Sequence, residues 1–199
     1  MKKIIEYFHD DIDYIDSRAL KSYTIECGYC NNKIAPNIGY YIHAKYQIIY
    51  IYKCPCCGNP IIYNTYTKEM IPGSMYGRDI KKLHENIQTL YDECRTCYSN
   101  QCYTSSQMIA RTLLMHIAVE QGAKEGETFA KYIDYLNTNG FIPPNGKKWV
   151  DFIRKSGNVA NHQIVIKEKE ETEKIISFLS SLLLFIYELP AEMDEDDKA

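Results

Sequence analysis

The sequence has no long apolar run and no strong excess of charge. Its most apolar stretch, residues 175–189, covers 15 residues, whereas a membrane-spanning helix needs about 20. The net charge of the 199 residues is −3, with a mildly basic middle between acidic ends. We therefore expect no membrane partner, and the charge permits contact with nucleic acid without arguing for it.

A secretory signal and internal repeats are also missing. The first residues are basic and then acidic, and no apolar core of the kind found in signal peptides follows them. Eight cysteines in a chain without such a signal indicate a reducing compartment, where metal binding is more common than disulfide formation. The expected location is the cytoplasm.

Four of the cysteines form two pairs with metal-ligand spacing. Cys27-x-x-Cys30 and Cys54-x-x-Cys57 are separated by 23 residues, and each pair can bring two thiolates to one tetrahedral ion. Two such turns joined by a hairpin make a zinc ribbon. Cys56 leaves Cys54-x-Cys56 open as an alternative pair, and we predict Cys57 as the ligand. Four thiolates leave no position for water, so the sequence predicts a structural Zn²⁺.

The composition changes near Pro72, from Tyr- and Ile-rich alternation to helical spacing. We predict an α+β protein with a small N-terminal β zinc ribbon followed by an all-α bundle of about five helices. The predicted strands are 21–27, 40–45, 46–54 and 60–66. The predicted helices are 79–99, 105–121, 128–138, 147–156 (interrupted by Gly157) and 169–188. The predicted parts are an N-terminal arm 1–20, the ribbon 21–72, the bundle 73–190 and an acidic disordered tail 191–199.

Residues 91–190 carry a family resemblance. The matching stretches are YTSSQMIARTLL, TFAKYIDYLNTNGFI, Ile153-Arg154 followed by Gly157-Asn158 and His162, and the closing FIYELP. They resemble a prokaryotic domain-of-unknown-function family found on type I restriction subunits and in phage-defence genes, within the HEPN-like superfamily. A four-cysteine ribbon often precedes that domain. The resemblance implies a HEPN-like bundle, a homodimer, and an RNA or nucleotide as ligand.

Many HEPN proteins are ribonucleases with an Arg-x(4–6)-His motif, so the resemblance implies Arg154, Asn158 and His162 as candidate catalytic residues. In this chain the spacing is longer, and Gly157 stands where the arginine is expected. Arg154 reaches the same cleft if Gly157 breaks the helix. The alternative is a purely structural role, in which Asn158 caps a helix and His162 forms a hydrogen bond across the bundle. Arg111 and His116 have the spacing of the Arg-x(4–6)-His motif, but the side chains of residues five apart on a helix point about 140° apart.

Lys147, Lys148, Trp149 and Lys155 are further binding candidates, because a basic strip beside an aromatic ring can contact phosphate. The alternative is a solvated helix face. Tyr40, Tyr41, Tyr46, Tyr50 and Tyr52 offer either stacking surfaces or a small core. Cys94, Cys97 and Cys102 are expected to be small packing residues, with a second metal or redox pair as the alternative.

Together these features predict a non-catalytic or weakly catalytic module that binds nucleic acid, a nucleotide or a protein partner, in phage defence or restriction. One alternative is a metal-independent ribonuclease toxin that uses Arg154 and His162. The other alternative is a dimeric assembly or adaptor protein.

Overall fold

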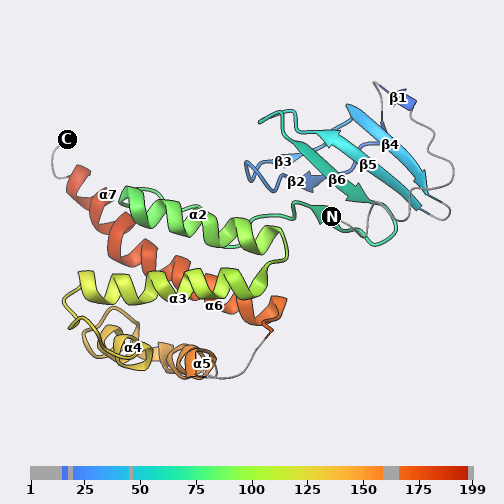
Figure 1. The fold of residues 1–199 in the computed structure, drawn as a ribbon. Helices are drawn as coiled ribbons and strands as arrows, with labels where there is room; N and C mark the ends of the chain where they lie inside the picture. Colours follow the sequence, from blue (N-terminus) through green and yellow to red (C-terminus); the bar gives the residue numbers. More distant parts are fainter. Residues whose placement is uncertain (1–14, 18–19, 45–46, 159–165, 197–199) are drawn as a thin grey trace. The chain divides into compact units, whose positions relative to one another are not determined.

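The computed structural model describes residues 15–17, 20–44, 47–158 and 166–196 (Figure 1). The chain divides into two compact units, Met1–Met75 and Tyr76–Ala199. The described residues of the first unit form strands and turns, and those of the second form helices. The α+β class predicted from the sequence is confirmed.

An antiparallel sheet forms the β unit, with strand order β1-β4-β5-β6-β7. A separate hairpin pairs β2 with β3. The strands are β1 Ile15–Ser17, β2 Ile25–Glu26, β3 Lys33–Ile34, β4 Gly39–Ala44, β5 Gln47–Lys53, β6 Pro60–Asn64 and β7 Met70–Ile71. Three predicted strands correspond to β4, β5 and β6, whereas only Ile25–Glu26 of the first predicted strand is a strand, and it belongs to the separate hairpin.

Tyrosines build the core of the β unit. Because side chains alternate along a strand, Tyr50 and Tyr52 of β5 point to the same buried face. Their rings stack with centroids 5.1 Å apart, and Tyr63 pairs with Tyr50 across the neighbouring strand. Tyr40 is exposed, and Tyr46 lies outside the described residues. Of the two predicted roles, stacking surface or small core, Tyr50 and Tyr52 therefore have the second.

Helix α3 lies at the centre of the helical unit and packs against α2, α4 and α6 (Figure 1). The helices are α2 Glu85–Ser99, α3 Tyr103–Glu120, α4 Phe129–Thr138, the 3₁₀ turn η1 Pro144–Gly146, α5 Lys147–Asn158, α6 Lys169–Leu183, the π-helical turn η2 Leu184–Glu188 and α7 Leu189–Asp196. The predicted helices all occur, with different ends.

The last helical run places its apolar seam inside the unit. Ile175, Leu179 and Leu182 are buried in one core with the apolar side chains of α3. By length and composition alone, Lys169–Asp194 could cross a membrane, and 39% of its most apolar window is buried inside the protein.

Three of the differences from the expected helix ends have a clear physical basis. The first predicted helix begins at Glu85 rather than residue 79, since Lys82 has φ +61° and the Lys81 amide donates to Glu188. Gly157 does not interrupt α5, which continues to Asn158. The tail predicted to be disordered from residue 191 is helical as far as Asp196, because extending an existing helix is far easier than starting a new one.

Candidate metal centre

Two turns of the same construction carry the paired cysteines. The first follows β2 and the second follows β5. In each turn the amide of the first cysteine donates to the carbonyl of an asparagine five residues later, Asn32 or Asn59, with N–O distances of 2.9 Å. The residue before that asparagine has positive φ, +58° at Asn31 and +76° at Gly58. This backbone conformation explains why glycine or asparagine stands there.

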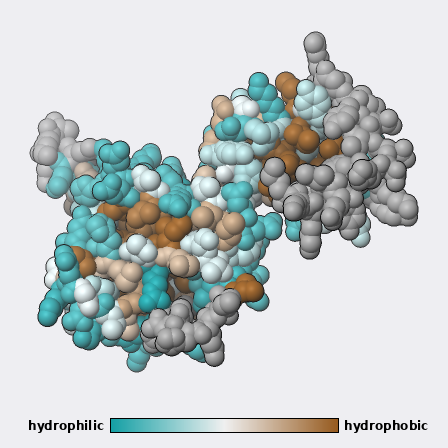
Figure 2. All heavy atoms as spheres, in the orientation of Figure 1, coloured by the Kyte–Doolittle hydropathy of each residue, from teal (hydrophilic) through white to brown (hydrophobic). Residues whose placement is uncertain are grey.

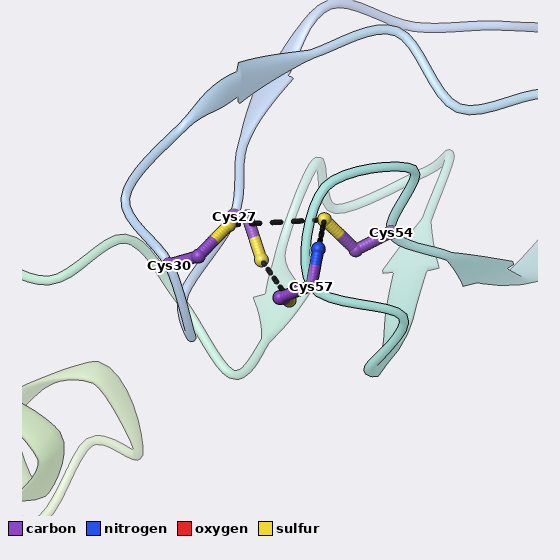
Figure 3. A group of neighbouring side chains, drawn as sticks. All are labelled: Cys27, Cys30, Cys54 and Cys57. Atoms are coloured by element: carbon purple, nitrogen blue, oxygen red, sulfur yellow. Dashed lines mark hydrogen bonds between the residues drawn. The ribbon is translucent and has the colours of Figure 1, made fainter.

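The four sulfurs of Cys27, Cys30, Cys54 and Cys57 converge between the two turns (Figure 3). Their ligand atoms all lie within 4.8 Å of one another. The Cys27–Cys57 and Cys30–Cys54 sulfur pairs are each 3.8 Å apart. A tetrahedron of sulfurs about 2.3 Å from its centre has edges of about 3.8 Å, whereas a disulfide needs about 2.0 Å. The group therefore has the size of a metal site.

Backbone and side-chain hydrogen-bond donors surround these sulfurs. The amides of Tyr29 and Cys57 point at the first sulfur of their turns, Cys27 and Cys54, at 3.4 and 3.5 Å. The side-chain amides of Asn32 and Asn59 approach the second sulfur, Cys30 and Cys57, at 3.4 and 3.5 Å. Such donors stabilise thiolates and orient metal ligands.

Sequence reasoning missed Asn32 and Asn59. A signal for them exists, because both turns read Cys-x-x-Cys-x-Asn. The repeated asparagine gives the second cysteine of each pair a side-chain donor.

The pKa values of the thiols follow burial and these donors. Burial raises the pKa of Cys27 to about 12. Burial acts in the same direction at Cys30, but the backbone and side-chain donors of Asn32 outweigh it and lower the pKa of that thiol to about 7. At Cys54, donors from the Cys57 and Cys56 amides outweigh burial and lower the pKa. The turns thus already favour thiolates at two positions, and thiolates are the form that binds metal.

The remaining cysteines lie apart from this group. Cys56 is exposed and is not among the converging sulfurs, so the structure pairs Cys54 with Cys57. Cys94 is buried and its thiol donates to the Ser106 carbonyl at 3.2 Å. Cys97 is half-buried and Cys102 is exposed. Within the described ranges, the four-cysteine group is the one set of side chains that could hold a metal.

Residues 92–198 match the model of a family described as Domain of unknown function (DUF4145). The chain belongs to this family. No curated protein and no solved structure matched the chain. The DUF4145 match covers α3 to α7 and most of α2, so the cysteine centre lies outside the shared domain.

Within the DUF4145 domain, Arg154 is held by acidic side chains. It forms ion pairs with Asp134 of α4 and with Asp151, one turn earlier on α5, the latter at 3.7 Å. Asp151 could be found from its i, i+3 spacing, whereas Asp134 becomes a partner only through the packing of α4 on α5. Asn158 is the last residue of α5, and His162 lies outside the described residues, so their predicted grouping with Arg154 remains a prediction.

A cavity of about 550 Å³ opens beside Arg154. Asn137 and Thr138 of α4 line it together with Lys147, Asp151 and Arg154 of α5. Lys147 and Arg154 lie seven residues apart, which places both on one face of the helix.

The other predicted binding residues do not share that cavity. Lys148 and Lys155 are exposed and do not line it. Trp149 is 39% exposed and stacks on Phe178 of α6 with ring centroids 6.2 Å apart. The structure therefore divides the predicted basic strip between two surfaces of α5.

The Arg111 and His116 pair is not brought together by α3. The Arg111 guanidinium lies over the Phe129 ring, 4.5 Å from its centroid, while His116 is exposed. Their five-residue separation turns the two side chains apart, as the helical geometry predicts.

Proposed function

We propose that this DUF4145 chain is a binding module rather than an enzyme. In this proposal the β unit is a zinc ribbon built around one structural Zn²⁺, and the helical unit carries the binding surface for an RNA, a nucleotide or a protein partner. A reducing, cytoplasmic location and a role in phage defence or restriction follow from the cysteine usage and from the family resemblance.

The donor set supports zinc at the cysteine centre. Cys27, Cys30, Cys54 and Cys57 offer four soft sulfur ligands at the edge length of a zinc tetrahedron. When bound, the ion would supply a cross-link between the two turns. Four protein sulfurs occupy every position of a tetrahedral ion, so no position is left at which water or substrate could be activated. The centre is therefore a scaffold.

The ion pairs of Arg154 are the observation that favours binding over cleavage. A ribonuclease arginine must offer its charge to the phosphate as negative charge develops there. In this chain two carboxylates, Asp134 and Asp151, already take up that charge. A phosphate in the neighbouring cavity would find one cation without an ion pair among the described lining residues, Lys147, together with the polar side chains of Asn137 and Thr138.

The test combines labelled single-stranded RNA and a labelled nucleoside triphosphate with purified protein. We expect binding without cleavage. Lys147→Ala should weaken binding and lower the slope of log affinity against log salt by about one. Lys148→Ala is the matched control, because the neighbouring lysine does not line the cavity.

Two results would overturn the proposal. Metal-independent RNA cleavage that is lost in His162→Ala would instead make the chain a ribonuclease. An absence of binding to either ligand, with no effect of Lys147→Ala, would favour the assembly-protein alternative. The predicted homodimer is checked separately by light scattering of the same samples.

A further inference from the structure

A second hollow lies on the opposite side of α5 from the Lys147 cavity. Its volume is about 310 Å³, and its walls are the segment from residue 141 to Trp149 on one side and α6 with η2 on the other. The largest lining side chains are Phe141, Trp149, Phe178, Leu182 and Phe185. It is an apolar groove with aromatic walls, unlike the polar cavity beside Arg154.

The groove continues as an exposed apolar stripe along the end of the last helix. Phe185, Leu189 and Met193 recur every fourth residue and are 54%, 37% and 72% exposed. From Phe178 to Met193 the helix rises about 22 Å, or four turns. Phe185 lies in the π-helical turn Leu184–Glu188, and such turns often occur at functional sites.

This surface is not explained by the packing of the helical unit. Single exposed apolar residues are ordinary, but contiguous large ones beside a hollow mark sites of interaction. On the face that Figure 2 draws, the helical unit has apolar surface bordered by hydrophilic residues, whereas the residues of the groove and stripe are those named above. A groove followed by a four-residue repeat has the form that receives an amphipathic helix, whose anchors recur at three- and four-residue steps.

The charge beside the stripe indicates what kind of helix this would be. Helix α7 carries Glu192, Asp194, Glu195 and Asp196 and no basic residue. Nucleic acid and anionic lipid would be repelled by this acidic end. A twofold pair of copies joined through the stripe would bring two such ends to one interface, where like charges repel.

We propose that the groove and stripe form a docking site for a basic amphipathic helix of a protein partner. A leucine or aromatic anchor of that helix sits between Trp149 and Phe185, and its lysines or arginines face α7. This site is separate from the Lys147 cavity, so the inference stands whether or not the chain binds RNA.

Trp149 supplies the assay, because it is the one tryptophan in the chain. Its fluorescence, excited where tyrosine does not absorb, reports on the groove directly. The probes are two designed tryptophan-free helical peptides with the same leucine face, one with lysines and one with glutamates on the polar face. We expect the lysine peptide to shift the emission of Trp149 to the blue and to bind at least about tenfold more tightly.

The variant Phe185→Ser should reduce binding of the lysine peptide by about tenfold or more. Its matched control is Met108→Ser, a change at a 66% exposed apolar residue of α3 that does not line the groove. Because both side chains are exposed, thermal melts should show that both variants fold. Equal binding of the two peptides, or unchanged binding by Phe185→Ser, would overturn the proposal. So would a concentration-dependent Trp149 shift without peptide, which would make a second copy the occupant.

Discussion

Adjacent cysteines in the second turn allow a sharp test of the metal centre. Cys57 belongs to the converging sulfurs and Cys56 does not, so Cys57→Ser should damage the site while Cys56→Ser should leave it intact. Structural zinc sites are worth roughly 10–16 kcal/mol in small peptides. One ligand of four then accounts for about 3 kcal/mol, which corresponds to about a hundredfold in affinity.

The measurement is Zn²⁺ affinity by competition with a chromophoric chelator, at a fixed pH because thiols release protons on binding. Wild type and Cys56→Ser should bind one Zn²⁺ per chain with the same affinity, and Cys57→Ser should bind about a hundredfold more weakly. The Co²⁺-loaded wild type should show the absorption of a tetrahedral thiolate site. The reasoning is refuted if Cys56→Ser weakens binding as much as Cys57→Ser, or if the wild type binds no metal.

Three further predictions concern backbone and burial. In the zinc-loaded protein, thermal melting should be unchanged by Gly58→Asn, since Asn31 adopts the same positive φ in the other turn, whereas Gly58→Ala should cost about 1 kcal/mol. Gly77→Ala should destabilise the helical unit to denaturant by about 2 kcal/mol, because its φ is +91° and an added Cβ would lie 2.7 Å from Ile176. Burial raises the pKa of Tyr91 from 10.0 to about 12. The folded state therefore keeps the full stability that the neutral Tyr91 gives it below about pH 10. As the pH rises toward 12, the free energy of unfolding falls by about 3 kcal/mol. Urea unfolding across this range should show a loss of stability that is smaller by about 3 kcal/mol in Tyr91→Phe than in wild type, because other buried tyrosines of the helical unit also have raised pKa values.

The periodic parts of the fold could be predicted because their pattern is local. Alternating tyrosines and isoleucines predict β5, and apolar residues that recur at steps of four and three predict α6. The start of α2 could not be read, because it depends on the Lys81 amide reaching Glu188, 107 residues away. Gly157 does not end α5, because one glycine costs a helix only about 1 kcal/mol, and the helix continues through it.

The metal centre was more predictable than the site in the helical unit, for a physical reason. A Cys-x-x-Cys turn fixes two ligands by local backbone geometry, so spacing alone identifies Cys27, Cys30 and Cys54 and narrows the fourth to two neighbours. The choice of Cys57 over Cys56 then follows from the turn, which directs Cys57 inward and leaves Cys56 exposed. The groove at Trp149 has no such local signal, because its walls come from segments about 30 residues apart in the sequence.

The role of Arg154 shows what a motif leaves undetermined. The sequence around Arg154 does not determine where its charge is used, because that depends on Asp134 from another helix. An anionic ligand at the cavity must either draw Arg154 away from Asp134 or bind through Lys147. The two routes differ in one variant. Asp134→Asn removes one of the two carboxylates that hold the arginine, so it should strengthen RNA or nucleotide binding if Arg154 takes part. It should leave the affinity unchanged if Lys147 alone holds the phosphate, and in that case Arg154 only joins α4 to α5.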